Sequence, residues 1–237
     1  MTLMISVHHL YKRFGPKTVL RELEFEAAEG EFVAVLGPNG AGKTTFLRIL
    51  ASLSRPSLGE VRIAGYSLPH QAASVRRRLG VVSHLPLLYG DLTAEENLRF
   101  YGRMYAVEQL DQRIGAVLEL VGLTSRRRDL VRTFSRGMQQ RLAIGRAVIH
   151  DPQVLLLDEP YTGLDQDASE MLDGVLRQVT GMDKSSRTVV MTSHDLLRAA
   201  DLAGRFDVLS HGAIRASKKM AELGAGGVVE FYKEAVG

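Results

Sequence analysis

The first third of the chain alternates apolar and polar positions, or runs apolar only over short lengths. Such runs cover 18–27, 31–37 and 60–66, and a further apolar run that includes 79–82 ends at Ser83. Each lies close to glycines or to charged turn residues, a pattern typical of β-strands. The sequence therefore predicts several short strands in this part of the molecule.

The middle of the chain has a different pattern. From Thr93 to about His150, apolar residues recur at every third or fourth position, as in "ENLRFYGRMYAV" and "RIGAVLELVGL", and this spacing indicates helices. Thr93 and Glu96 have the spacing of a capping box, in which two side chains bond the free N–H groups at a helix start. We therefore expect a helix to begin there.

Short apolar runs return after the helical segment, and helical stretches separate them. They cover 154–160, 188–194 and 206–212. Alternation of strands and helices implies a parallel sheet covered by helices. The simplest architecture is an α/β core, built from both ends of the chain, that carries a helical insertion in its middle.

Composition agrees with a folded domain. A chain of 237 residues with 45% hydrophobic residues can bury one large core or two small ones. We expect a single domain over 1–237, with the core formed by 1–88 and 151–237 and the helical insertion by 89–150. We expect no sizeable regulatory domain in the residues after about 212.

Several classes of protein are disfavoured. The chain has no cysteine, which excludes disulfides and thiolate metal sites. Its first residues are too polar for a signal peptide, and no apolar stretch approaches the roughly 20 residues that span a bilayer. We therefore expect a cytoplasmic protein whose membrane role is peripheral. The net charge of +3 is small and its basic residues are scattered, so composition gives little reason to expect nucleic-acid binding.

The strongest chemical motif is "GPNGAGKTT" at 37–45, which follows a predicted strand and precedes a predicted helix. This is the context that a phosphate-binding P-loop requires. Glycines let backbone N–H groups surround the phosphate oxygens, the lysine reaches the β- and γ-phosphates, and a threonine hydroxyl can bind Mg²⁺. The residues expected to contact nucleotide are Gly37, Pro38, Asn39, Gly40, Ala41, Gly42, Lys43, Thr44 and Thr45.

A second motif, "VLLLDEP", places Asp158 and Glu159 at the end of an apolar strand. Open α/β sheets bind ligands at this end of their strands. Asp158, with Thr44, suits a Mg²⁺ site, and Glu159 can polarise the water that attacks a phosphate. The alternative is that both residues merely cap the next turn, but the accompanying P-loop favours a catalytic site.

With these motifs, the chain resembles the nucleotide-binding subunits of ABC transporters over nearly its whole length. "TFSRGMQQRLAIGRA" at 133–147 is similar to the signature of that family. Ser135 and Gly137 match it, whereas Phe134, Arg136 and Met138 depart from the common Leu, Gly and Gln. Ser135 can cap a helix whose positive end faces a phosphate; in the family, that phosphate belongs to ATP bound by the other subunit.

The resemblance implies roles for three further residues. Asp165, in "YTGLD", occupies the acidic position of a loop that crosses the dimer interface. His194, after "TVVMTS", resembles the switch histidine that contacts the γ-phosphate. Phe14 lies where the family places an aromatic ring against adenine, and Tyr11 is a weaker candidate; stacking of a base on a ring contributes roughly 1 to 3 kcal/mol in nucleic-acid complexes.

One family residue is missing. Where family members carry a glutamine that reaches Mg²⁺ and the attacking water, this chain has His84 by one spacing and Leu85 by a shorter one. Gln71 lies too early. If His84 is the replacement, its imidazole still offers an acceptor to water; if Leu85 is, the contact is lost. A lost hydrogen bond to a charged centre costs about 1.5 to 3 kcal/mol, so hydrolysis is expected to weaken more than ATP binding.

The resemblance implies an α/β P-loop NTPase fold of the ABC ATPase type, with a parallel sheet, an N-terminal antiparallel β subdomain and a helical subdomain. It implies an ATPase that uses ATP and Mg²⁺, forms an ATP-sandwich homodimer and energises membrane-spanning subunits at the inner face of the cell membrane. The phrases "LGVVSHLPLLY" and "FSRGMQQR" look most like the heme exporter of cytochrome c maturation, and next like drug or polysaccharide exporters.

Two other classes fit less well. A soluble ABC ATPase that acts on nucleic acid generally has two motif sets, or a coiled coil or zinc module between P-loop and signature, and this chain has neither. A P-loop kinase or GTPase has no use for "SRGMQQR" or for the switch histidine. We therefore expect no nucleic-acid partner.

Overall fold

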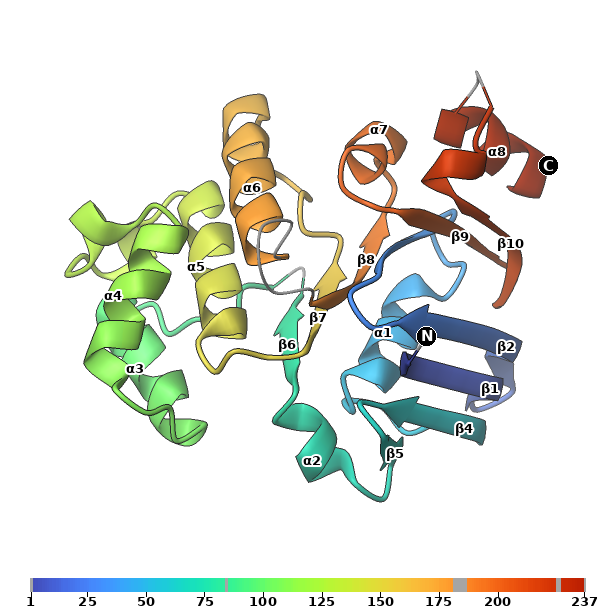
Figure 1. Ribbon diagram of the computed structural model, residues 1–237, viewed down its shortest axis with the longest axis horizontal. Coiled ribbons are helices and arrows are strands. Elements are labelled where there is room, and N and C mark those ends of the chain that lie inside the picture. Colours follow the sequence, from blue (N-terminus) through green and yellow to red (C-terminus); the bar gives the residue numbers. More distant parts are fainter. Residues whose placement is uncertain (1, 84, 181–186, 225–226, 237) are drawn as a thin grey trace.

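A six-stranded sheet forms the centre of the molecule (Figure 1). The computed structural model describes residues 2–83, 85–180, 187–224 and 227–236. All neighbouring strands of this sheet run parallel except β10, which pairs antiparallel with β9 at one edge. The strand order is β10 (Ala213–Lys219), β9 (Arg205–Ser210), β3 (Phe32–Leu36), β8 (Thr188–Ser193), β7 (Val154–Asp158) and β6 (Leu79–Val82).

The central strands explain the uninterrupted apolar runs of the sequence. Every residue of β3, β7 and β8 is buried, because helices or the second sheet cover both faces. Side chains alternate between the faces: Val33 and Val35 contribute to one hydrophobic core, and Ala34 and Leu36 to another. The predicted parallel sheet is therefore confirmed.

A second, four-stranded antiparallel sheet lies beside the first, in the order β2, β1, β4, β5. The resemblance implied this antiparallel N-terminal sheet, and the structure confirms it. The apolar pattern did not predict β1, one of two 12-residue strands in the sheet, because two adjacent exposed histidines interrupt its alternation. The register of β1 and β2 shifts between Val7 and Leu10, where His9 has a φ of 49°. The bounds are β1 Leu3–Phe14, β2 Lys17–Ala28, β4 Leu58–Ile63 and β5 Tyr66–Leu68; the single run at 60–66 thus divides at a turn.

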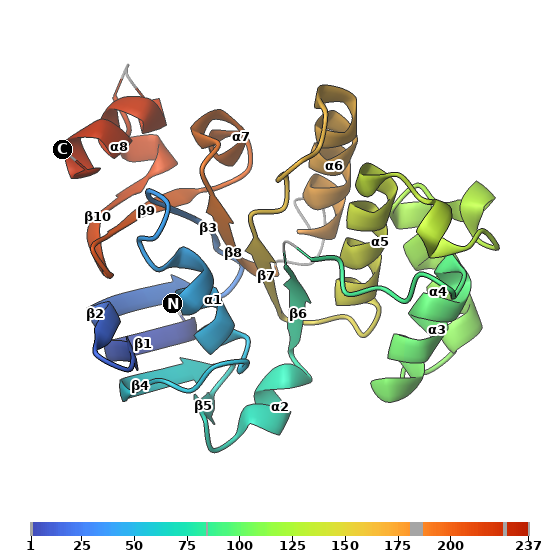
Figure 2. The same ribbon diagram turned by 180° about the vertical axis from the view of Figure 1, so that it is seen from behind.

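Helix α1 (Lys43–Leu50) lies between the two sheets (Figure 2). Phe46 is fully buried, and its ring meets that of Phe25 edge to face with 5.1 Å between centroids. The helix thus joins the antiparallel sheet to β3 in one core. This packing fixes the start of α1 just beyond the carboxyl end of β3.

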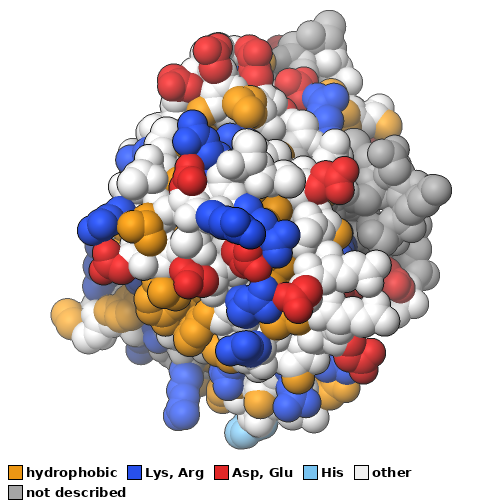
Figure 3. All heavy atoms as spheres, turned by 90° about the vertical axis from the view of Figure 1, so that its left-hand side faces the viewer, with side chains coloured by type: hydrophobic (Ala, Val, Ile, Leu, Met, Phe, Trp, Pro, Cys, Tyr) orange, Lys and Arg blue, Asp and Glu red, His pale blue; other side chains and the backbone are white. Residues whose placement is uncertain are grey.

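The predicted helical segment forms one end of the molecule, the face seen in Figure 3. As expected, α3 begins with a capping box: Glu96 N donates to Thr93 Oγ1 at 3.2 Å, and Thr93 N donates to Glu96 Oε2 at 2.8 Å. The helices here are α3 (Ala94–Met104), α4 (Leu110–Leu120) and α5 (Arg136–Val148), with short 3₁₀ turns at Thr124–Arg126 and Val131–Thr133. All fall within 89–150; the division into subdomains stays a prediction.

The remaining helices cover the faces and ends of the central sheet. Helix α6 packs against α5, and α8 against α7 and β9. Of the helices in the described part of the chain, none has both the length and the apolar character to cross a membrane. They are α2 (Ala72–Arg76), α6 (Gln166–Val179), α7 (Leu196–Ala200) and α8 (Gly227–Val236), with a 3₁₀ turn at Met220–Glu222.

Candidate functional site

The loop between β3 and α1 adopts backbone angles that require glycine. Gly40 has a φ of 80° and Gly42 a φ of 113°, in a region that other residues rarely adopt. A Cβ on Gly42 would also lie 2.7 Å from Leu20 Cδ2. The loop therefore needs glycine at position 42 for both conformation and space.

Lys43, the first residue of α1, is held inside this loop. Its side chain is only 7% exposed. Its Nζ donates to Gly37 O at 2.7 Å and to Pro38 O at 3.4 Å, and lies 3.5 Å from Glu159 Oε1. An ammonium beside the free N–H groups of a helix start concentrates positive charge, which suits a phosphate.

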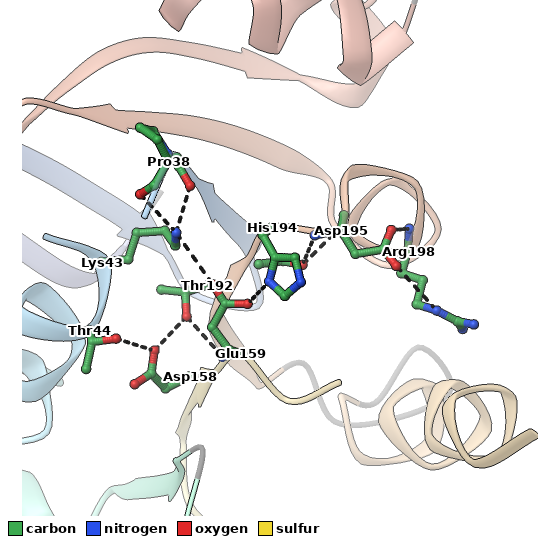
Figure 4. Close-up of polar contacts among 11 residues, drawn as sticks. Pro38, Lys43, Thr44, Asp158, Glu159, Thr192, His194, Asp195 and Arg198 are labelled. Carbon is green, nitrogen blue, oxygen red and sulfur yellow. Dashed lines mark hydrogen bonds and ion pairs between the residues drawn. The ribbon is translucent and has the colours of Figure 1, made fainter. Parts of the chain in front are cut away.

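Thr44 and Asp158 come together from α1 and β7 (Figure 4). The Thr44 hydroxyl donates to Asp158 Oδ1 at 3.2 Å, and the Thr192 hydroxyl donates to the same oxygen at 2.8 Å. Thr192 belongs to β8, the parallel neighbour of β7. The arrangement leaves hydroxyl and carboxylate oxygens, the ligands that Mg²⁺ prefers, side by side.

Glu159 lies between the lysine and the histidine of the site. Its backbone N donates to Thr192 O at 3.2 Å and to Thr192 Oγ1 at 3.1 Å, and its φ is 51°. This turn directs its carboxylate so that Oε1 faces Lys43 while Oε2 contacts His194 Nδ1 (Figure 4). Glu159 is 18% exposed and His194 63% exposed, so the histidine lies on the solvent side of the pair.

Lys43, Thr44, Asp158, Glu159 and His194 line one open cavity of about 920 Å³. Sequence reasoning missed several of its wall residues, because Lys17, Arg21 and His211 belong to no motif. Thr192 was also missed, although a hydroxyl residue directly after the apolar residues 189–191 of β8 is a signal. The lining residues are Lys17, Thr18, Val19, Arg21, Pro38, Asn39, Gly40, Gly42, Lys43, Thr44, Thr45, Asp158, Glu159, Thr162, His194, His211 and Gly212.

The signature residues lie apart from this cavity, at the start of α5. Ser135 Oγ accepts from Met138 N at 3.2 Å, so the expected helix cap is confirmed. A Cβ on Gly137 would lie 2.8 Å from Ala168 Cβ, which shows how closely α5 packs against the start of α6. Neither Ser135 nor Gly137 is among the described residues that line the cavity.

Asp165 also caps a helix, because its Oδ1 accepts from Ala168 N at 2.8 Å at the start of α6. It lines a smaller hollow, of about 320 Å³, together with Glu159 and His194. Sequence reasoning did not foresee a contact of Arg136, whose guanidinium lies against Gly163; a Cβ there would be 2.6 Å from Arg136 Cζ. The signature and the loop that contains Asp165 therefore touch within one chain.

The remaining candidate residues that the structure describes are not among those that line the cavity. Phe14, at the end of β1, is 54% exposed, and Lys12 Nζ lies 4.7 Å from its ring centroid. Leu85 is 58% exposed, and its carbonyl accepts from Ser83 Oγ at 2.6 Å. His84 lies outside the described residues, so which of the two replaces the missing glutamine stays a prediction.

Comparison with known proteins places these residues in a family context. A family model described as "ABC transporter" matches residues 20–162. The chain is 35% identical over 211 residues to a linearmycin resistance ATP-binding protein of Bacillus subtilis, with 88% of this chain and 67% of the relative covered. It is 37% identical over 224 residues to the Nod factor export ATP-binding protein I of Ralstonia nicotianae, with 94% and 69% covered.

Solved structures agree in the fold. An ATP-binding subunit of an ABC transporter superposes with a TM-score of 0.87 at 28% identity, over 98% of this chain and 99% of the other. A dimeric ATP-binding cassette in a post-hydrolysis state, bound to ADP and Pi, superposes with a TM-score of 0.81 at 28% identity, over 91% and 98%. The likeness therefore extends over the central sheet, the second sheet and the helical end.

Proposed function

This chain belongs to the ABC transporter family as an ATP-binding and ATP-hydrolysing subunit, and from that premise we propose that it energises an exporter through the site described above. One observation carries the assignment of the site: Lys43, Thr44, Asp158, Glu159 and His194, from separate segments of the chain, line one cavity at the carboxyl ends of β3, β7 and β8. Lys43 and the α1 N-terminus would bind the β- and γ-phosphates of ATP.

Mg²⁺ fits the oxygen pair of Thr44 and Asp158. One hydroxyl and one carboxylate, 3.2 Å apart, suit an ion that usually takes few protein ligands and completes its shell with phosphate oxygens and water. When bound, Mg²⁺ would neutralise charge on the transferred phosphoryl group. Thr192 would orient Asp158 through its hydrogen bond to Oδ1.

Glu159 would act as the general base, with His194 as its neighbour. A phosphate on Lys43 would draw the ammonium away from the Glu159 carboxylate, which leaves that carboxylate free to accept a proton from water. His194 contacts the other carboxylate oxygen and so would hold Glu159 in place while facing the γ-phosphate. Phe14 would stack on adenine, using the ring face away from Lys12.

We further propose that two chains enclose ATP, with Ser135 and Gly137 of one chain facing the nucleotide of the other. The separation of the signature from the cavity supports this arrangement, as does the dimer of the structurally similar cassette. Ser135→Arg should then damage the partner's site. In mixed dimers that combine Ser135→Arg in one chain with Lys43→Ala in the other, one composite site stays intact and activity should survive. Normal activity in Ser135→Arg homodimers would contradict the arrangement.

The membrane partner would dock at the helical end. Phe100 and Met104 are 44% and 60% exposed on α3, and with Glu96, Arg99 and Arg103 they line a shallow hollow of about 650 Å³. The surface in Figure 3 shows hydrophobic and charged side chains mixed on this end, as at many docking surfaces. Through such a partner the protein would sit at the inner face of the membrane.

Co-purification tests this partner. Phe100→Asp should reduce recovery of membrane-spanning subunits from detergent-solubilised membranes while ATP hydrolysis by the purified chain continues. Leu53→Asp is the matched control, because Leu53 is 67% exposed and lies outside the helical end. Equal recovery with both variants would place the docking surface elsewhere.

Export is the direction that the relatives favour. One relative is named a linearmycin resistance ATP-binding protein and another a Nod factor export ATP-binding protein, so we propose that the membrane subunits export a drug-like cargo. The cytochrome c maturation type rests only on the resemblance of "LGVVSHLPLLY", "LTAEENLRFYGRMYAV" and "FSRGMQQR" and stays a prediction. Transport assays with membranes that contain the co-purified partner would separate the two cargo classes.

A further inference from the structure

A partly buried carboxylate joins two segments of the site. Asp173, on α6, accepts from the Tyr161 hydroxyl at 2.5 Å through Oδ1 and from Arg198 Nη1 at 2.8 Å through Oδ2. Tyr161 begins the 161–165 loop, two residues after Glu159, and Arg198 lies on α7, just after His194. Both oxygens of one carboxylate are therefore used to tie the two segments to α6.

Arg198 makes further contacts on both sides. Its Nη2 donates to Gln166 Oε1 at 3.0 Å, and its Cζ lies 5.5 Å from the centroid of the Tyr161 ring. Its Nε lies 3.5 Å from Asp195 Oδ2, and Asp195 Oδ1 accepts from Arg198 N at 3.1 Å. Because Asp195 follows His194 directly, the turn that presents the histidine is fixed to the same guanidinium (Figure 4).

The three side chains are shielded enough for these bonds to matter. Arg198 is 17% exposed and Asp173 19% exposed. Burial, followed by the hydrogen bond to Asp173, raises the pKa of the Tyr161 hydroxyl, so it stays a donor at neutral pH. Loss of one member would leave its partner with an unpaired polar group in a partly buried place.

Position distinguishes this network from an ordinary structural ion pair. Arg205 is equally shielded, at 16% exposure, and also contacts two carboxylates, those of Glu31 and Asp207. Its contacts join β9 to its surroundings and do not involve the loops of the site. The Asp173 network instead begins next to Glu159 and ends next to His194, which contact each other directly.

We propose that Tyr161, Asp173 and Arg198 are positioning residues that hold the His194 turn and the 161–165 loop in one fixed relation, so that Glu159 and His194 keep the geometry needed for ATP hydrolysis. The inference rests on the function proposed above for Glu159 and His194. It implies that the network affects the chemical step and leaves the binding of ATP to the P-loop unchanged.

Two conservative substitutions in the full chain test the proposal. Tyr161→Phe removes one hydroxyl, and Arg198→Lys keeps the charge but cannot reach Asp173 and Gln166 together. Each should lower kcat by about five- to tenfold, the effect of one lost hydrogen bond on a rate, while KM for ATP changes by less than about twofold. The double variant should lose less than the product of the single effects, because both act through Asp173.

Two control variants show how much Tm and kcat change when a similar contact outside the site is lost. Tyr66→Phe removes a hydroxyl that accepts from Arg78 Nη2 at 3.0 Å, beneath a guanidinium 4.4 Å from its ring centroid. Arg205→Lys alters an arginine of similar exposure. Both controls should lower Tm about as much as the test variants and leave kcat unchanged.

The outcomes separate the inference from the function on which it rests. If Tyr161→Phe and Arg198→Lys change Tm but not kcat, or raise KM alone, the network is structural and the proposal is wrong. His194→Ala tests the underlying function separately. If His194→Ala loses most of its turnover while Tyr161→Phe keeps the parent kcat, the role of His194 stands and only the positioning proposal is wrong. If His194→Ala hydrolyses ATP at the parent rate, the role of the histidine fails and the positioning proposal falls with it.

Discussion

The imidazole of His194 contacts the carboxylate of Glu159 although 35 residues separate them in sequence. Glu159 follows β7 and His194 follows β8, and the two strands pair in parallel with Asp158 opposite Thr192. Parallel pairing therefore brings the two residues to the same edge of the sheet. The contact gives the proposed base a fixed neighbour on the side away from Lys43.

Glu159→Gln should separate binding from hydrolysis. Glutamine keeps the size of the side chain but cannot accept a proton from water, so turnover should fall by about 10² to 10⁴, while ATP still binds. With Mg-ATP the variant should accumulate as a dimer, measured by light scattering. A variant that stays monomeric and hydrolyses ATP at the parent rate would mean that Glu159 is not the base.

Lys43→Ala should abolish tight ATP binding. The ammonium is buried against the carbonyls of its own loop, so its charge would lie directly beside the β- and γ-phosphates of bound ATP. Isothermal calorimetry measures the loss. Lys17→Ala is the control, because Lys17 lines the same cavity but is exposed, and it should weaken binding far less. Equal losses for both lysines would contradict a special role for Lys43.

The local parts of this site could be predicted from the sequence. The P-loop and the helix caps at Thr93 and Ser135 depend on residues within a few positions of one another, so short patterns identify them. Alternation alone did not predict β1, because the irregular pairing at His8 and His9 breaks the pattern on which strand prediction depends; only the family resemblance implied an antiparallel sheet there.

Contacts between residues far apart in the sequence could not be predicted for a different reason. Thr192 meets Asp158, and Arg198 meets Asp173, only after β8 has paired with β7 and α7 has packed near α6. No local pattern encodes those pairings. The family resemblance supplied His194 but not its contact with Glu159, which depends on side-chain geometry.

His150 should make stability depend on pH. Burial lowers the pKa of its imidazole to about 4 from an ordinary 6.5; its ring stacks on Tyr105 with 3.8 Å between centroids, and Nε2 bonds Leu79 O. Well above pH 6.5 the imidazole is neutral in both the folded and the unfolded chain, so it does not make stability depend on pH there. As pH falls from about 6.5 toward 4, protonation favours the unfolded state, so stability should fall by an amount on the order of 2 to 3 kcal/mol.

Urea denaturation at several pH values between about 7 and 4 measures this effect. His150→Gln is the comparison, because an amide can still donate to the Leu79 carbonyl but does not titrate in this range. The parent should lose more stability than the variant on acidification. Curves that run parallel would show that His150 titrates alike in the folded and unfolded chains.

The missing glutamine gives the last prediction. An exposed leucine at position 85 can neither coordinate Mg²⁺ nor orient water, so Leu85→Gln should raise Mg-dependent ATP hydrolysis by about ten- to a hundredfold if this is the family position. ATP affinity should change far less. Leu87→Gln is the matched control, because Leu87 is 56% exposed on the same loop and should have no effect.

The alternative at position 84 predicts the opposite pattern. If the imidazole of His84 has taken over the contact with water, His84→Ala should collapse turnover and Leu85→Gln should do little. Steady-state ATPase rates of both variants, with ATP binding measured separately, distinguish the two positions. If neither substitution changes the rate, the loop contributes nothing to hydrolysis, and its exposed Leu85 and Leu87 would then serve contact with the membrane partner alone.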